Sequence, residues 1–205
     1  MRVQTKTQKP LSPRQENILL SLKKLDFLNR EQLQRLHGLG EKRNANRILS
    51  TLYSYLSRYR EEYTTVYYLN AKGREYVMCE KVRKKGNKVN HTLIRNDFYI
   101  FSGCPTEWKN EIRLGDGDKI SVVCDSWYKS DGYYNILEVD HLQSMKENRT
   151  KVMKYLSLYQ SGIFEDKLGY FPPLTWVTTT ELRRKQLQEI CKDIPSVVYT
   201  TTDIK

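Results

Sequence analysis

The most telling part of the sequence is residues 43–56, RNANRILSTLYSYL. If this stretch is a helix, one of its faces carries Arg, Asn, Ser and Thr and the other is apolar. No Asp or Glu occurs between Arg43 and Arg60. Solvated helix faces usually carry many Glu and Lys, so this composition favours a helix that faces DNA. Its apolar side chains recur at helical spacing and form one stripe: Ala45, Ile48, Leu49, Leu52, Tyr55 and Leu56.

Two further helices are predicted before this stretch. Ser12 and Pro13 are a favourable N-cap and first residue for a helix whose apolar positions continue to Leu25. Asn29 is the N-cap of a shorter second helix. The Gly-containing turn at residues 37–40 then joins that helix to the third, as in a helix-turn-helix.

A strand or hairpin is predicted after the third helix. Residues 61–69 are rich in β-branched and aromatic side chains. Asn70 is the N-cap of a following helix that contains Gly73. A hairpin after a recognition helix is a wing, so the order predicts a winged helix-turn-helix DNA-binding domain over residues 13–80.

The polar face of the third helix is expected to enter the major groove. Arg and Asn suit bidentate contacts with base edges, while Ser, Thr and Lys suit phosphates. The candidate DNA-binding residues are Arg43, Asn44, Asn46, Arg47, Ser50, Thr51, Ser54, Arg58, Lys84 and Lys85.

Positive charge is concentrated in the first half of the chain. Residues 1–90 contain 20 Lys and Arg against 8 Asp and Glu, whereas residues 91–205 contain 15 against 16. This asymmetry predicts a polyanionic partner, here double-stranded DNA, for the first half. We expect a flexible basic arm at 1–12, a basic linker at 81–90 and a second domain at 91–205.

The composition also excludes several classes of protein. No run of apolar residues is long enough to span a membrane, and the basic N-terminus lacks the apolar segment of a secretory signal. The four cysteines are scattered, which disfavours a disulfide framework or a zinc site. We expect a cytoplasmic protein, associated with a bacterial nucleoid or plasmid, without a membrane partner.

The second half predicts the order helix, three strands, helix, strand, helix, strand. This order is the core of a PD-(D/E)XK nuclease-like fold, so the fold class expected for the whole chain is α+β. The predicted architecture is an N-terminal winged helix-turn-helix followed by an α/β PD-(D/E)XK nuclease-like domain.

Three acids fall on the three predicted strands, namely Glu111, Asp125 and Glu138. Clustered carboxylates of this kind can hold Mg²⁺ or Mn²⁺ for phosphodiester hydrolysis. Such a site also needs a Lys two residues after the third acid, to stabilise developing negative charge, but Asp140 stands there. Lys146 from the next helix could replace it. The metal ligands of an active enzyme would be Asp125, Glu138 and Asp140.

Two interpretations of the second domain therefore stay open. The favoured one is a non-cleaving scaffold that needs no cofactor. The alternative is a metal-dependent DNA nickase or nuclease that uses Glu111, Asp125 and Glu138. A relaxase with a tyrosine nucleophile is disfavoured because the three histidines are far apart in the sequence.

The chain resembles the replication-relaxation family of plasmids, phages and conjugative elements. The resemblance rests on Tyr68-Leu69-Asn70 with Gly73, on Asn96-Asp97, and on Asp125. Its strongest part is Ile136–Asp140, ILEVD, followed by a helix with Lys154-Tyr155 and Tyr159. The resemblance implies that an Asp at position 140 is ordinary, which favours the non-cleaving interpretation.

These observations predict a sequence-specific double-stranded DNA-binding protein of a mobile element. It would act in transcriptional control or as an accessory factor in replication or mobilisation. The second domain would form a homodimer, bind a replication or conjugation protein, or hold DNA without cutting it. A further alternative is an adaptor that uses DNA binding only for targeting.

Overall fold

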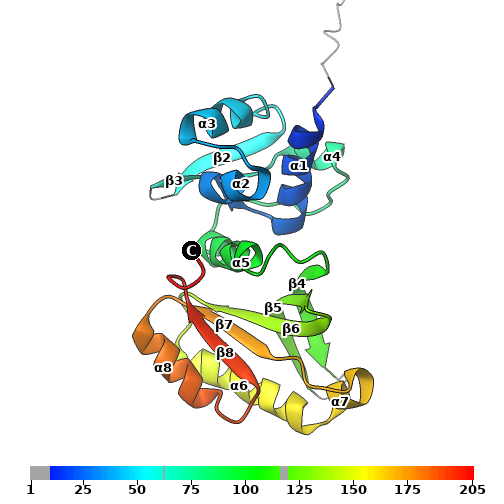
Figure 1. Cartoon of the computed structure of the whole chain (residues 1–205), viewed down its shortest axis with the longest axis vertical. Coiled ribbons are helices and arrows are strands. Elements are labelled where there is room, and N and C mark those ends of the chain that lie inside the picture. The colour runs from blue at the N-terminus through cyan, green and yellow to red at the C-terminus, as the bar shows by residue number, and fades with distance from the viewer. Residues whose placement is uncertain (1–9, 62, 116–119) are drawn as a thin grey trace, which may run out of the picture. The chain divides into compact units, whose positions relative to one another are not determined.

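The computed structural model describes residues 10–61, 63–115 and 120–205. The chain divides into two compact units, residues 1–86 and 87–205. Each unit combines helices with a β-sheet, so the chain is of mixed α+β architecture (Figure 1). None of the described helices has the length and the apolar character needed to cross a bilayer.

The first unit contains a three-stranded antiparallel sheet of order β1-β3-β2. Helices α1 and α2 pack against β3, and α3 packs against α2. The elements in chain order are α1 (Pro13–Leu25), β1 (Leu28–Asn29), α2 (Arg30–His37), α3 (Lys42–Ser50), β2 (Leu56–Glu61), β3 (Thr64–Leu69) and α4 (Ala71–Tyr76).

Side-chain caps start the helices at the predicted positions. Ser12 accepts a hydrogen bond from the Gln15 amide and begins α1, with Pro13 as the first helical residue. Asn29 begins α2 in the same way, and Asn70 begins α4 by accepting from the Gly73 amide. Each cap satisfies an amide that lacks a partner inside the helix, so the three predicted helix starts are confirmed.

The third helix is shorter than the sequence pattern predicts. It ends at Ser50, residues 51–55 form turns, and Leu56 already pairs with Leu69 in the β2–β3 hairpin. Leu52 and Tyr55 are buried although they lie outside the helix. The turns after Ser50 place apolar side chains at nearly the spacing of a helix. The apolar stripe therefore continues beyond the end of α3, and the predicted helix end at Leu56 was wrong for this reason. The short strand β1, which pairs with Val66 and Tyr67, was not predicted.

Close backbone packing explains the glycine at position 73. A Cβ atom at Gly73 would lie 2.1 Å from the carbonyl oxygen of Tyr55. That same oxygen accepts a hydrogen bond from the Asn70 amide at 3.1 Å. Helix α4 is thereby fixed directly against the turn that precedes β2, and no larger residue fits there.

The second unit contains a five-stranded sheet of order β4-β5-β6-β7-β8. Strands β4, β5 and β6 are antiparallel, whereas β6, β7 and β8 are parallel. The elements are α5 (Val89–Phe101), β4 (Trp108–Gly115), β5 (Ser121–Ser130), β6 (Tyr133–Asp140), α6 (Met145–Gln160), α7 (Ile163–Leu168), β7 (Leu174–Thr178), α8 (Glu181–Ile190) and β8 (Ser196–Thr200). The predicted order is confirmed, with α7 as an additional short helix.

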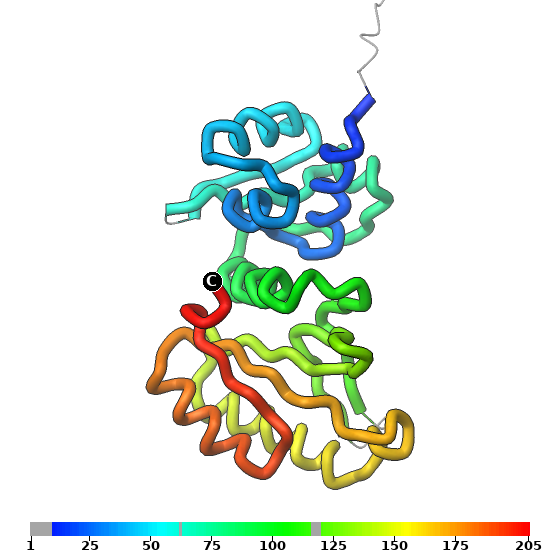
Figure 2. The backbone as a smooth tube through the Cα atoms, viewed as in Figure 1, coloured from blue at the N-terminus to red at the C-terminus, as the bar shows by residue number. Residues whose placement is uncertain are grey.

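Helices cover both faces of this sheet. Helix α5 lies on one face, while α6 and α8 lie on the other (Figures 1 and 2). The main core lies on the α6 side and includes Cys124, Tyr155 and Trp176. On the other side, Phe98 of α5 packs against Tyr128. Strand β7 is buried along its whole length, as expected for a parallel strand covered on both faces.

Candidate functional site

The outer face of α3 is polar and basic, as the sequence predicts. Arg43, Asn46, Arg47 and Ser50 are exposed, while Ala45 and Leu49 are buried. Within the described residues, neither Arg43 nor Arg47 takes part in an ion pair. Arg43 is therefore open to an external anion. Arg47 Nη2 donates to Asn44 Oδ1 at 2.8 Å, and the other N–H groups of its guanidinium can still reach an anion.

Side chains hold the turn that precedes α3. Gly38 ends α2 in the left-handed conformation, with φ 57°. Gln34 Nε2 donates to the Gly40 carbonyl at 2.6 Å, and Asn44 Nδ2 donates to the Leu39 carbonyl at 2.7 Å. These bonds fix the start of α3 relative to α2. Asn44 thus has an internal role, and base contact by this residue stays a prediction.

The hydroxyl groups near the end of α3 bond within the unit. Ser50 Oγ donates to the Arg47 carbonyl at 2.8 Å. Thr51 Oγ1 donates to the Ile48 carbonyl and accepts from Gln15 Nε2 at 2.7 Å. The last of these bonds ties the end of α3 to the start of α1. The remaining candidate of this region, Ser54, is exposed in the following turn.

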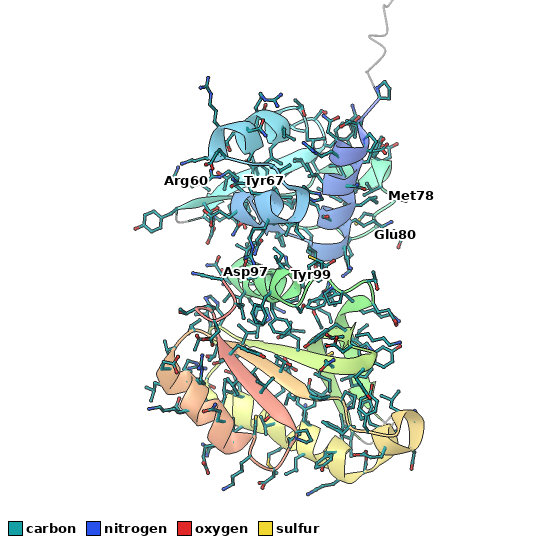
Figure 3. All side chains as sticks on the ribbon, in the orientation of Figure 1. Arg60, Tyr67, Met78, Glu80, Asp97 and Tyr99 are labelled. Carbon is teal, nitrogen blue, oxygen red and sulfur yellow. The ribbon has the colours of Figure 1, made fainter. Side chains whose placement is uncertain are left out.

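The β2–β3 hairpin adds cations to the same unit. Arg58 is exposed on β2, and its guanidinium carbon lies 3.5 Å from the centroid of the Tyr53 ring. Arg60 lies two residues further on, so strand alternation puts it on the same face as Arg58. Figure 3 labels Arg60 on this hairpin. Stacking on Tyr53 restricts the Arg58 side chain while it keeps the guanidinium edge exposed.

The basic run after α4 is held against the first unit. Arg83 Nε donates to Asp26 Oδ1 at 2.9 Å, and the Asp26 side chain is buried. Lys85 forms an ion pair with Glu61 at 3.8 Å and lies 5.0 Å from the Tyr59 ring. Lys84 is exposed. The predicted linker at 81–90 overlaps α5, which begins at Val89.

In the second unit, Asp125 bridges two strands where they separate. The β5–β6 ladder ends at the pair Ser126–Leu137. Beyond it, Asp125 Oδ2 accepts from the Val139 amide at 2.7 Å, and Oδ1 lies 3.0 Å from His91 Nε2 on α5. Burial alone would raise the pKa of Asp125, but the hydrogen bond and charge of His91 outweigh it and lower that pKa to about 2.

Glu138 is buried beneath α6, with 1 % of its surface exposed. Its two carboxyl oxygens accept hydrogen bonds from Lys151 Nζ and from the Tyr155 hydroxyl. Burial, together with the nearby charge of Asp125, raises the pKa of Glu138 well above its ordinary value. Lys151 and Tyr155 oppose this rise, because both donate hydrogen bonds to the carboxyl group and so favour its charged form.

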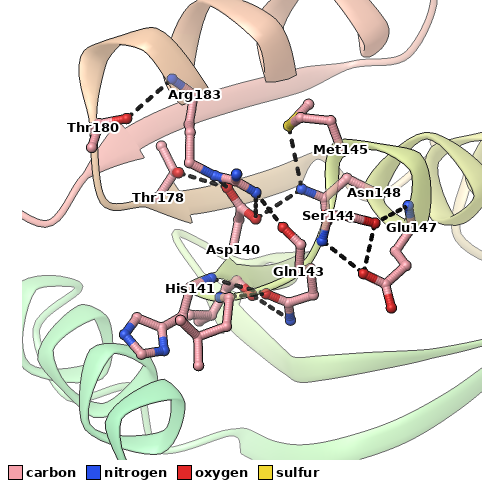
Figure 4. A network of polar contacts seen from close by, with 12 residues as sticks. Asp140, His141, Gln143, Ser144, Met145, Glu147, Asn148, Thr178, Thr180 and Arg183 are labelled. Carbon is pink, nitrogen blue, oxygen red and sulfur yellow. Dashed lines mark hydrogen bonds and ion pairs between the residues drawn. The ribbon is translucent and has the colours of Figure 1, made fainter.

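Asp140 forms a network with two helices and a strand (Figure 4). It accepts from Thr178 Oγ1 at 2.7 Å and from Asn148 Nδ2 at 2.8 Å. Arg183 of α8 donates to both carboxyl oxygens, with Nε at 2.6 Å. Although burial opposes it, these hydrogen bonds lower the pKa of Asp140. The position where a nuclease needs a lysine therefore holds an arginine-bound carboxylate.

The predicted acids are not arranged as a metal site. Glu111 is exposed on β4, with φ 55°, and the β4–β5 register skips both Glu111 and Asp125. Glu138 and Asp140 point toward α6 and bond to cationic side chains, whereas Asp125 bonds to α5. No group of three or more His, Cys, Asp or Glu side chains in the described residues could hold a metal ion. The arrangement does not fit Mg²⁺ or Mn²⁺, and a metal-dependent activity stays a prediction.

A basic pocket of about 720 Å³ lies beside the buried Glu138. It is open to solvent, and Lys151, which bonds to Glu138, forms part of its wall. Lys146, the predicted replacement for the missing lysine, lines this pocket and is exposed. The complete lining is Arg113, Ser121, Val122, Val123, Lys146, Glu147, Thr150, Lys151 and Lys154.

Sequence reasoning missed the partners of the acids. Lys151 and Tyr155 are one helical turn apart on α6, so both reach Glu138. That spacing is visible in the sequence, but the direction of their side chains depends on how α6 packs. Arg183 lies 43 residues from Asp140, and no local pattern connects the two.

Comparison with known proteins places this chain in a family. The family model described as Replication-relaxation matches residues 19–174, which is more than half of the chain. The crystal structure of protein VC1899 from Vibrio cholerae is similar with a TM-score of 0.40 and 15 % identity. The match covers 95 % of this chain and 55 % of that one, so this chain spans about half its length. No curated protein matches the sequence. The match to the family model shows that the chain belongs to the replication-relaxation family.

Proposed function

We propose that this protein binds double-stranded DNA in a sequence-specific manner through a winged helix formed by its first unit. In this proposal α3 is the recognition helix and enters the major groove. The protein then serves a plasmid, phage or conjugative element, either in transcriptional control or as an accessory factor in replication or mobilisation. Membership of the replication-relaxation family supports the role in replication or mobilisation.

The observation that carries the proposal is the outer face of α3. Arg43, Asn46 and Arg47 are exposed there, and α3 contains no acidic residue. Recognition helices contact bases mainly through residues near their N-terminal end, where Arg43 lies, while Asn46 and Arg47 continue the same exposed face along α3. The turn held by Gln34 and Asn44 supports the proposal because a fixed helix loses little conformational entropy on binding.

The β2–β3 hairpin is proposed as the wing. Arg58 and Arg60 project from one face of β2, and Tyr63, directly before β3, is almost fully exposed. Cations on a hairpin neutralise backbone phosphates and position the protein without reading sequence. Lys84 is proposed to add a further phosphate contact.

The second unit is proposed to be a PD-(D/E)XK-like scaffold that does not cleave DNA. The support is the network of Asp140, in which Arg183 occupies both carboxyl oxygens. Lys151 and Tyr155 engage Glu138 in the same way. Because Glu138 and Asp140 are bound to internal donors, their carboxyl oxygens are not available as ligands for a divalent cation.

A binding measurement with two matched double variants tests the proposal. The probe is a fluorescent duplex of about 30 base pairs, which is long enough for two half-sites one helical turn apart. Arg43→Ala plus Arg47→Ala removes two charges from α3. Lys167→Ala plus Lys185→Ala removes two exposed charges from the second unit.

We expect the α3 variant to bind the duplex at least about tenfold more weakly, because each lost contact costs on the order of 1 kcal/mol. The variant in the second unit should bind as the unmodified protein does. Equal affinity of the α3 variant and the unmodified protein would contradict the proposal.

A further inference from the structure

The basic pocket of the second unit has no role in the function proposed so far. It is formed by β4, β5 and α6, and its volume is about 720 Å³. Four cationic side chains line it, namely Arg113, Lys146, Lys151 and Lys154. The second unit as a whole is neutral, with 16 Lys and Arg against 16 Asp and Glu over residues 87–205, so this concentration of cations is local.

Internal contacts engage only part of this positive charge. Glu147 is the one acid in the lining, and it accepts from the amide and hydroxyl of Ser144 at the start of α6. Lys151 is paired with Glu138. Among the described residues, Lys146 and Lys154 form no ion pair and are exposed. The pocket therefore presents uncompensated positive charge to solvent.

The two unpaired lysines of the pocket, Lys146 and Lys154, lie along one face of α6. Lys146, Thr150 and Lys154 follow one another at intervals of four residues, so they lie on the same face of α6. Eight residues of α-helix span about 12 Å. One strand of B-DNA carries a phosphate about every 3.4 Å along its axis, so lysines this far apart can reach phosphates about three or four positions apart on one strand.

The remaining lining favours a phosphate backbone over a base or a free nucleoside. Ser121 supplies a hydroxyl group whose oxygen accepts from Arg113 Nη1 at 2.6 Å, whereas the Thr150 hydroxyl donates to the Lys146 carbonyl within α6. None of the lining residues is aromatic. Recognition of a base usually relies on stacking against an aromatic ring, whereas phosphates need only cations and hydrogen-bond donors.

We propose that this pocket is a second nucleic-acid site, which holds the phosphodiester backbone of DNA through Lys146, Lys154 and Arg113. The site extends the DNA binding proposed for the first unit and rests on it for the identity of the polymer. It reads no sequence, because its contacts are to phosphates alone. Its effect is to increase affinity and to fix a stretch of DNA on the second unit.

The salt dependence of duplex binding by the full chain tests this site. Each phosphate contact contributes about −0.9 to the slope of log affinity against log salt concentration. Lys146→Ala plus Lys154→Ala should therefore make the slope shallower by about 1.8. Lys146→Arg plus Lys154→Arg keeps the charges and should keep the slope, and so should Lys167→Ala plus Lys185→Ala. All these positions are exposed, and unchanged urea midpoints would show that the variants fold.

The outcomes separate this site from the function proposed above. If Lys146→Ala plus Lys154→Ala leaves the salt-dependence slope unchanged, the proposal that the pocket binds DNA is overturned. This holds even when Arg43→Ala plus Arg47→Ala weakens duplex binding. If Lys146→Ala plus Lys154→Ala makes the slope shallower while Arg43→Ala plus Arg47→Ala leaves the affinity unchanged, the pocket is supported and DNA reading by α3 is overturned. A full chain that binds no duplex at any salt concentration overturns both. Saturable binding of ATP that depends on Lys146 and Lys154, without a change of slope, would also overturn the backbone site.

Discussion

Replacing Asp140 by alanine tests the network that occupies the nuclease-like position. The carboxylate is fully buried, and it accepts hydrogen bonds from Thr178, Asn148 and Arg183. Without it, the Arg183 guanidinium and two neutral donors lose their partner. Removing one member of a buried ion pair costs about 3 to 5 kcal/mol. The Arg183 side chain is 24 % exposed and can recover some hydration, so we expect a loss near about 3 kcal/mol in the free energy of unfolding.

Tryptophan fluorescence during urea unfolding measures this loss of unfolding free energy in the second unit, where Asp140 lies. All three tryptophans, Trp108, Trp127 and Trp176, belong to the second unit. For a slope of about 1.5 kcal/mol per molar urea, a loss of about 3 kcal/mol lowers the midpoint by about 2 M.

Two further variants make the result specific. Asp140→Asn keeps the size of the side chain but removes its charge, so it should cost about 1.5 to 3 kcal/mol, between the alanine variant and the unmodified protein. Asp166→Ala removes an exposed acid of α7 and should change stability by less than about 0.5 kcal/mol. An Asp140→Ala variant as stable as Asp166→Ala would refute the reasoning.

Three other predictions concern Asp140, Gly73 and Asp125. Asp140→Lys restores the lysine of a nuclease motif but places a cation against Arg183, so it should destabilise the second unit and leave supercoiled plasmid intact in Mg²⁺; a folded variant that nicks plasmid would contradict this. Gly73→Ala forces a Cβ onto the Tyr55 carbonyl and should cost about 1 to 3 kcal/mol or more, measured by circular dichroism during urea unfolding. Gly86→Ala, in open space, is its control and should be harmless. The folded pKa of Asp125 is about 2, below the ordinary 3.8, so its contribution of about 2 kcal/mol is present above pH 4 and is lost as the pH falls toward 2. The stability difference between the unmodified protein and Asp125→Asn should therefore shrink over that range, and a constant difference would count against it.

Local chemistry explains which parts of the fold could be predicted. Ser12, Asn29 and Asn70 begin helices because each one bonds to an amide three residues ahead. The order of helices and strands along the second unit follows from β-rich and helix-periodic stretches separated by turn residues. Where tertiary packing decides, sequence reasoning failed. The end of α3 at Ser50 depends on the pairing of Leu56 with Leu69, which no local pattern reveals.

The candidate site shows the same division. The exposed polar face of α3 follows from helical periodicity, so its residues could be predicted individually. The acids of the second unit were found by their positions on strands, but their chemistry depends on distant partners. Arg183 comes from α8 and His91 from α5, and both meet their acids only after the sheet and helices assemble.

Selection of binding sites from a random duplex library is the most direct test of the central claim, that α3 reads DNA sequence. The unmodified protein should enrich one motif. Arg43→Ala plus Arg47→Ala should lose preference at some positions of that motif while it keeps weak binding through the hairpin and the basic run. Enrichment of the same motif by both proteins, or of no motif by the unmodified protein, would contradict the account.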